Sequence, residues 1–215
     1  MSLQGYASRT GNRRNLEVMR RHSWGILISP YDPSLPKGFD RMCLDNGAWT
    51  AHTKGIDWDQ PRFERALDKF GADADFVVAP DIWCGGQDSL DLSKKWIKPL
   101  LGISKKVLIP IQDGMLAEDL EPMLNERVGL FLGGSTEYKW RTVSYWAEVA
   151  KRHRAHYHVA RVNSVKTMRT CHLYGVDSFD GSGPSRFAIE AERLGNGLKQ
   201  IKRQPALFGV VKGGI

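Results

Sequence analysis

Residues 107–134 read VLIPIQDGMLAEDLEPMLNERVGLFLGG and contain two short apolar runs with polar or glycine endings. Val107–Ile111 ends at Gln112, and Val128–Leu132 ends at Gly133–Gly134. Runs of this length, rich in β-branched and apolar residues, are typical of strands buried on both faces of a sheet. Further runs of the same kind lie on both sides of this stretch: Trp24–Ser29, Met42–Asp45, Phe76–Pro80, His156–Val162 and Val176–Phe179.

Helical patterns lie between most of these strands. Asp59 ahead of Pro61 predicts the start of one helix, and Gly71 predicts its end. Apolar residues at spacings of three and four form three stripes: Phe63, Leu67 and Phe70; Val143, Ala147 and Ala150; and Phe187, Ala191, Leu194, Leu198 and Ile201.

Alternation of buried strands with amphipathic helices predicts an α/β fold with a parallel sheet. Seven strands, with a possible eighth at Leu207–Val211, favour closure into a compact (β/α)8 barrel of the TIM type. At 215 residues, 41% of them hydrophobic, the chain can bury one sizeable core and is short for two domains. We therefore expect a single catalytic domain over residues 1–215.

Charge and cysteine content limit the classes to which this protein can belong. The formal net charge is +7, which favours a polyanionic partner because each neutralised phosphate releases counterions. No apolar stretch is long enough for a membrane span, and the polar start, Met1 to Arg14, lacks a signal-peptide centre. Cys43, Cys84 and Cys171 lie far apart, so close-pair metal sites and a disulfide framework are not expected. We expect a soluble cytoplasmic protein that does not bind a membrane.

Polar or glycine residues follow the predicted strands where each one ends. In a (β/α) barrel these ends meet on one face, which is where active sites lie. The residues expected to meet there are Asp45, Asp81, Gln112, Gly133, Gly134, Arg161, Asn163 and Asp180.

Three carboxylates around one pocket favour covalent or acid/base chemistry at a carbon that bears a leaving group, as in glycosyl transfer. For any one aspartate, capping of a helix or turn is the competing interpretation. Trp49 is a candidate for stacking on a heterocycle or for packing, and Gly133–Gly134 for donating N–H groups or for making a tight turn. Nothing in the pattern calls for a cofactor or a metal.

Five segments resemble, in order and approximate spacing, motifs of the tRNA-guanine transglycosylase superfamily. The most specific is Gly175–Gly181 (GVDSFDG), which resembles the nucleophile motif Gly-Ile/Val-Asp-Met-Phe-Asp. The other four are Asp45–Trp49 (DNGAW), Pro80–Asp81, Ile111–Gly114 (IQDG) and Leu130–Ser135 (LFLGGS).

The resemblance implies a role for each matched residue. Asp180 is implied as the nucleophile on C1′ of a nucleoside, and Asp45 as the acid/base group on the base nitrogen. Trp49 is implied to stack on that base. Asp81 and Gln112 are implied to bind a guanine-like edge, and Gly133 and Gly134 to donate to its carbonyl.

One departure from the tRNA enzymes matters for the substrate. Their zinc site of three cysteines and a histidine follows the nucleophile motif, whereas no cysteine follows Cys171 here. The short zinc-free form, with His158–Ser164 ahead of the nucleophile motif, resembles the phage and bacterial DNA 7-deazaguanine transglycosylases. Those enzymes exchange guanine in DNA for a 7-deazaguanine such as preQ0, which protects phage DNA from restriction. This resemblance implies DNA and a free 7-deazaguanine base as partners, in the host cytoplasm if the chain is phage-encoded.

Several alternatives stay open at this stage. The enzyme could act on RNA, could hydrolyse a glycosidic bond with the same carboxylates, or could be an inactive barrel that binds nucleic acid. Arg161 and Asn163 are candidates for orienting the nucleophile or contacting phosphate, with a strand-end salt bridge as the other interpretation of Arg161. His158 is expected to be a core histidine with satisfied ring nitrogens. The inserted base, any sequence preference and the oligomeric state are left open.

Overall fold

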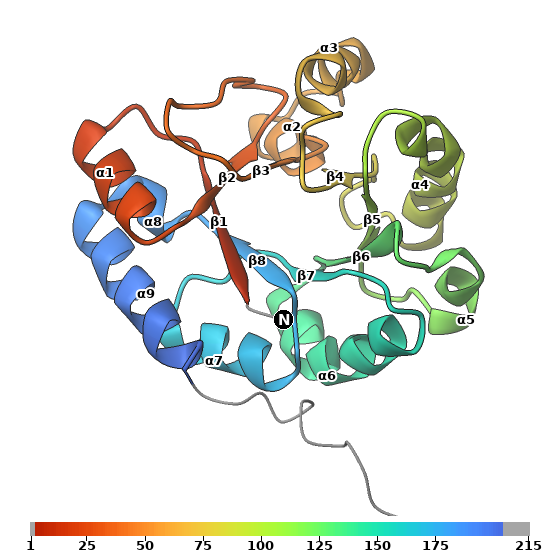
Figure 1. The fold of residues 1–215 in the computed structure, drawn as a ribbon. Helices are drawn as coiled ribbons and strands as arrows, with labels where there is room; N and C mark the ends of the chain where they lie inside the picture. Colours follow the sequence, from red (N-terminus) through yellow and green to blue (C-terminus); the bar gives the residue numbers. More distant parts are fainter. Residues whose placement is uncertain (1–2, 204–215) are drawn as a thin grey trace, which may run out of the picture.

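The computed structural model describes residues 3–203, which form a closed barrel of eight parallel strands ringed by helices (Figure 1). Each strand pairs with the next along the chain, and the first pairs with the last. The predicted (β/α)8 barrel is confirmed. The strands are β1 (Gln4–Ser8), β2 (Gly25–Ile28), β3 (Met42–Leu44), β4 (Val77–Val78), β5 (Val107–Ile111), β6 (Val128–Leu132), β7 (Tyr157–Val159) and β8 (Ser178–Gly181).

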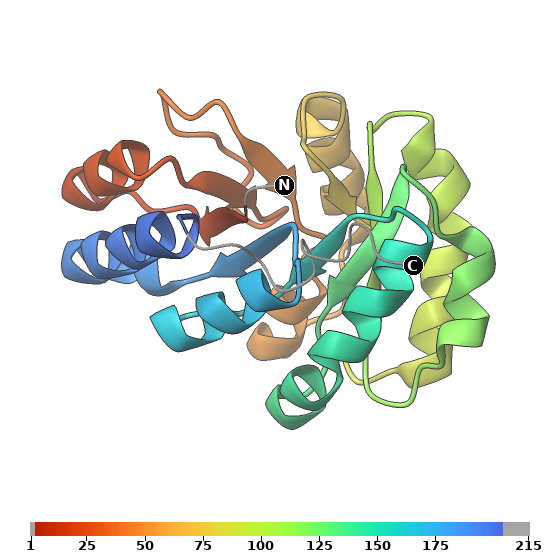
Figure 2. The ribbon, with the colours of Figure 1, turned by 60° about the horizontal axis from the view of Figure 1, so that its bottom comes forward.

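The helices cover the outside of the barrel. They are α1 (Arg13–Arg21), α2 (Ala48–Lys54), α3 (Gln60–Phe70), α4 (Gly86–Leu101), α5 (Ala117–Leu120), the 3-10 turn η1 (Glu121–Met123), α6 (Thr136–Arg152), α7 (Val165–Leu173), α8 (Gly183–Arg186) and α9 (Ala188–Ile201). Figure 2 shows α1, α9 and α7 along one flank of the barrel, and α3 and α4 on the other. None of the helices that the structure describes is both long and apolar enough to cross a membrane.

The expected helix signals are confirmed with one exception. The Asp59 side chain accepts the N–H of Arg62 at 2.9 Å and so caps α3, which ends before Gly71. The stripes on α3, α6 and α9 are buried apart from Phe187. Phe187 is 62% exposed because it occupies the extended N-cap position of α9, where its side chain points away from the stripe.

The last two predicted strands differ from the observed ones at their ends. The seventh run was expected to stop at Phe179 with Asp180 after it, whereas Asp180 lies within β8, paired with Tyr6 of β1. The sixth run was expected to reach Val162, but β7 ends at Val159. Arg161 has a φ of 58°, a left-handed conformation that interrupts the extended backbone of a regular strand.

The strand that closes the barrel is the one that the sequence pattern missed. Closure comes from β1 at the amino terminus, while the proposed eighth strand Leu207–Val211 lies outside the described residues. Gly5 allows this closure, because a β-carbon there would lie 2.6 Å from the Trp24 ring and 3.0 Å from Phe179.

Apolar side chains fill two layers. A small cluster from β1, β3, β4 and β5 lies inside the barrel: Tyr6, Cys43, Phe76, Val78 and Leu108. A larger cluster lies between the strands and the helices. The interior is therefore packed, as in other barrels of this type, and open space is left at the ends.

Candidate active site

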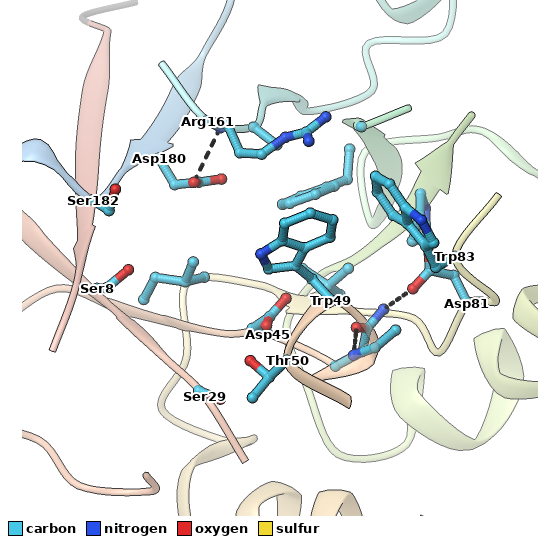
Figure 3. Close-up of a pocket in the computed structure, with 18 of the residues that line it drawn as sticks. Ser8, Ser29, Asp45, Trp49, Thr50, Asp81, Trp83, Arg161, Asp180 and Ser182 are labelled. Atoms are coloured by element: carbon cyan, nitrogen blue, oxygen red, sulfur yellow. Dashed lines mark hydrogen bonds between the residues drawn. The ribbon is translucent and has the colours of Figure 1, made fainter. Parts of the chain in front are cut away.

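A cavity of about 530 Å³ opens at the carboxyl end of the barrel (Figure 3). All nine residues selected from the sequence line it: Asp45, Trp49, Asp81, Gln112, Gly133, Gly134, Arg161, Asn163 and Asp180. In Figure 3, Trp49 lies between Asp180 on one side and Asp81 with Trp83 on the other. The expected convergence on one pocket is therefore observed, while the chemical role of each residue stays a prediction.

Asp180 is a buried carboxylate held by two nitrogen donors. Its side chain is 10% exposed. Oδ1 accepts the backbone N–H of Arg161 at 3.1 Å, and Oδ2 lies 3.0 Å from Nε2 of His158. His158 is fully buried and stacks on Phe131 with ring centroids 4.8 Å apart. Because a buried carboxylate needs such donors, these contacts fix the orientation of the Asp180 side chain.

Arg161 contributes mainly through its backbone. Its left-handed φ turns the peptide N–H toward Asp180, and its guanidinium donates to the carbonyl of Gly134. The guanidinium carbon also lies 5.6 Å from the Trp49 ring centroid and 5.7 Å from that of Trp83. No salt bridge to Arg161 is present within residues 3–203, and its contact with phosphate stays a prediction.

Lys139 of α6 is a buried residue that the sequence pattern did not single out. Its Nζ donates to the carbonyl of Ala160 at 2.6 Å. That carbonyl belongs to the same peptide unit as the Arg161 N–H that binds Asp180. Burial and the neighbouring Arg161 charge lower the pKa of Lys139 to about 8. A charged Lys139 polarises this peptide and strengthens its bond to Asp180.

Asp45 has the ionisation expected of an acid/base group. Burial, with the nearby charges of Asp180 and Asp81, raises its pKa to about 7, although the N–H of Gly47 donates to its carboxylate at 3.3 Å. A carboxyl group with a pKa near neutrality can both give and take a proton at physiological pH.

Asp81 is held by two amide side chains. Nδ2 of Asn46 donates to it at 2.8 Å and Nε2 of Gln112 at 2.6 Å. Burial raises the pKa of Asp81 to about 6, and these two donors oppose that rise. Asp81 is therefore fixed at the wall of the cavity, with its orientation set before any ligand binds.

The polar atoms of Gln112 are engaged within the protein. Nε2 also approaches the Ile82 carbonyl at 2.9 Å and the Ser89 hydroxyl at 3.1 Å, and Oε1 accepts the N–H of Gly85 at 3.1 Å. Gln112 thus anchors Asp81 and the loop at 82–85. In this arrangement it holds a neighbouring group and does not present a free edge to the cavity.

Two tryptophans form the aromatic wall of the cavity. Trp49, at the start of α2, is 47% exposed, and its ring centroid lies 4.5 Å from that of Trp83. Trp83 was missed because it follows β4 by several residues; its closeness to Pro80–Asp81 was the one available signal. The exposure of Trp49 favours stacking on a ligand over packing in the core.

Gly133 and Gly134, which follow β6, differ in whether their backbone N–H groups are already hydrogen-bonded. The N–H of Gly133 donates to the Ile111 carbonyl at 3.0 Å as part of the barrel ladder. Gly134 has a φ of 67°, and a β-carbon there would lie 2.5 Å from a carboxylate oxygen of Asp113. Within residues 3–203 its N–H donates to no protein acceptor, so Gly134 is the one of the pair with a free donor.

A further part of the wall contains four residues that the sequence pattern missed, Ser8, Arg9, Ser182 and Arg186, together with the selected Asn163. The pairing of Tyr6 with Asp180 places Ser8 of β1 next to Ser182. Arg9 pairs with Asp32 at 2.5 Å, and Arg186 is exposed at the end of α8. Asn163 accepts the N–H of Gly183 at 2.8 Å and so holds the loop that carries Ser182. These residues surround the space next to the nucleophile candidate with hydroxyl and guanidinium groups.

No protein-family model matches the chain, and no curated protein matches its sequence. Within residues 3–203, no group of three or more histidine, cysteine or acidic side chains is placed to hold a metal ion. The function is therefore inferred from the geometry and ionisation of the cavity.

Proposed function

We propose that this chain is a base-exchange transglycosylase that replaces guanine in DNA with a free 7-deazaguanine base, with Asp180 as the nucleophile. The observation that carries the proposal is the set of carboxyl groups around one cavity. Asp180 is held by two N–H donors, while the pKa values of Asp45 and Asp81 are raised to about 7 and about 6. Carboxyl groups that differ in how readily they ionise are suited to the two roles of nucleophile and acid/base partner in glycosyl transfer.

The first half of the reaction releases guanine. The target nucleotide leaves the base stack, because its C1′ is otherwise out of reach of a pocket. Asp180 attacks C1′ and forms a sugar ester as the bond from C1′ to the base nitrogen breaks. Protonated Asp45 gives its proton to that nitrogen, and neutral guanine departs.

The second half reverses these steps with a new base. The 7-deazaguanine enters the vacated slot, and the Asp45 carboxylate removes the proton of its ring N–H. The nitrogen attacks C1′ and displaces Asp180, which returns as a carboxylate. Asp45 ends the cycle protonated, as it began, so the exchange requires no net proton and no external energy source.

The base slot is proposed to lie on the side of Asp81, Trp49 and Trp83. Asp81 accepts from the amino and ring N–H groups of a guanine-like edge, and the indole rings stack on its face. Gly134 donates its free N–H to the base carbonyl. Gln112 and Asn46 act through Asp81 by holding its carboxylate in place.

Three further features support a nucleic-acid substrate, and the last of them favours DNA. A cavity of about 530 Å³ is of a size that holds a nucleoside. The net charge of +7 suits a polyanion, and the zinc-free sequence resembles the DNA enzymes of the superfamily. We propose that the reaction takes place in the cytoplasm, that of the host if the chain is phage-encoded, where the inserted base protects DNA from restriction.

The test is incubation with labelled preQ0 and, in separate reactions, duplex DNA, single-stranded DNA and tRNA, followed by mass analysis of the nucleosides. The expected product is a 7-deazaguanine deoxyribonucleoside. A ribonucleoside from tRNA alone would contradict the DNA assignment and favour the RNA enzyme. Release of guanine without incorporation would favour a hydrolase. No product with preQ0 or other 7-deazaguanines, together with DNA binding that Asp180→Asn leaves unchanged, would favour an inactive nucleic-acid-binding barrel.

A further inference from the structure

A row of buried polar side chains leads from Asp180 into the core of the barrel. Nε2 of His158 lies 3.0 Å from Asp180, and its Nδ1 lies 2.8 Å from the hydroxyl of Ser178. The same hydroxyl lies 2.7 Å from Nε2 of His156. His158 and Ser178 are fully buried. The row is therefore continuous and shielded from solvent between its two ends.

The two ends of the row open into different cavities. Asp180 lines the cavity at the carboxyl end of the strands. His156 lines a second cavity of about 600 Å³, together with Lys106 and Asp177. Because these three residues precede β7, β5 and β8, the second cavity lies at the amino end of the barrel. The row thus crosses the barrel interior from one end to the other.

With Asp180 as a carboxylate and His158 as a neutral imidazole, the bonding rules fix the direction of every proton in the row. A carboxylate only accepts, so His158 carries a proton on Nε2. The Nδ1 of a neutral His158 then accepts from Ser178, and the Ser178 oxygen accepts from Nε2 of His156. Burial, with the charge of Lys106, lowers the pKa of His156 to about 3, so this ring is neutral and its single proton is on Nε2. All three donors therefore point toward Asp180.

We propose that His156, Ser178 and His158 are positioning residues: the row sets the tautomer of His158, so that its Nε2–H donates to Asp180 and holds the carboxylate in the orientation of a nucleophile.

The positioning role rests on the proposed function, whereas the proton arrangement within the row does not. The charged and titratable side chains that face the row are Tyr6 of β1, Arg41 and Cys43 at β3, Asp45 after β3, Lys106 before β5, Lys139 of α6, Arg161 after β7, and Asp177 before β8.

The first experiment is nitrogen-15 NMR of histidine-labelled protein at pH 7, with His156→Gln used to assign the His156 ring. The expected result for the unaltered protein is a neutral ring with the proton on Nε2 at both His156 and His158. A proton on Nδ1 of either ring, or a doubly protonated His158, would overturn the inference. The measurement uses the folded chain without substrate.

The second experiment is Ser178→Ala, which removes the link between the two histidines, with the buried Ser104→Ala as the matched control. Ser104 donates to the Lys106 carbonyl and lies outside the row. Ser178→Ala is expected to mix the tautomers of His158 and to lower kcat for base exchange about tenfold with KM unchanged. Ser104→Ala is expected to leave the His158 tautomer and kcat at their original values. Unchanged tautomers and kcat in Ser178→Ala would refute the inference while the proposed function stands. If the tautomers are as expected but the protein has no exchange activity, the proposed function is refuted and the proton arrangement stands.

Discussion

At the scale of single residues, the central feature is that Asp180 and Asp45 share a cavity but differ in environment. Asp180 is held by the N–H of Arg161 and by His158, whereas Asp45 accepts the backbone N–H groups of Gly47 and Asn46 and its pKa is raised to about 7. Two carboxyl groups of the same chemical type are thereby suited to two different tasks, one as an anion and one as a proton carrier.

Asp180→Asn tests the nucleophile. The amide keeps the size of the side chain but cannot form the ester, so exchange should fall at least about 1,000-fold. Trapping of a covalent protein–DNA species on denaturing gels should disappear as well. Asp91→Asn on the exposed face of α4 is the matched control and should retain both activities. Full exchange by Asp180→Asn would exclude the proposed mechanism.

Asp45→Asn tests the raised pKa through stability. The folded pKa of about 7 lies above the unfolded value of 3.8, so the contribution of Asp45 to stability is complete below about pH 3.8 and is lost as the pH rises through 7. Removing the charge should therefore stabilise the protein more at pH 8 than at pH 5, by about 2.5 kcal/mol. In thermal unfolding this corresponds to a difference of roughly 5–10 °C. An equal effect at both pH values would contradict the assigned ionisation.

At the scale of elements, the closure of the barrel depends on β1, the strand with the weakest sequence signal. Gln4–Ser8 contains one aromatic residue and no β-branched residue, yet it pairs with β2 on one side and β8 on the other. This pairing also places Tyr6 beside Asp180, so β1 forms part of the support of the candidate site.

Gly5→Ala tests this closure. Its β-carbon would lie 2.6 Å from the Trp24 ring, so β1 or Trp24 must shift, at a cost of about 1–3 kcal/mol. The melting temperature should fall by roughly 2–10 °C. Gly11→Ala is the matched control, because nothing lies within 4 Å of a β-carbon at that position. Equal melting temperatures for the two variants would show that the contact of β1 with Trp24 is not tight.

At the scale of the whole molecule, the positive charge and the cavity together suggest how a polyanion approaches. Arg186 is exposed and lines the cavity, on the segment that follows β8 and Asp180. If the sugar lies at Asp180, a neighbouring phosphate lies within reach of this part of the cavity.

Arg186→Ala should weaken DNA binding and reduce the slope of log K against log salt by about 1, because one phosphate contact is lost. The measurement is fluorescence anisotropy of labelled DNA over a range of salt concentrations. Arg65→Ala on the exposed face of α3, away from the cavity, should leave the slope unchanged. A slope equal to that of the unaltered protein in Arg186→Ala would place the phosphate contacts elsewhere.

The sequence by itself determined the barrel and the set of residues at its carboxyl end. Alternating buried strands and amphipathic helices can close in few ways, and parallel strands bring their ends to one face whatever the details of packing. Asp45, Asp81, Gln112 and Asp180 could therefore be placed together from strand ends alone.

The tertiary structure decided which strand closes the barrel, what each polar atom bonds to and which carboxyl groups have raised pKa values. The burial of β1 comes from Trp24 and Phe179, the bonds of Gln112 come from the loop at 82–85, and the row behind Asp180 comes from the register of β7 against β8. These are contacts between residues far apart in the chain. A local pattern of apolar and polar residues carries no information on such contacts, because hydrogen bonding and ionisation depend on neighbours that only the closed fold brings together.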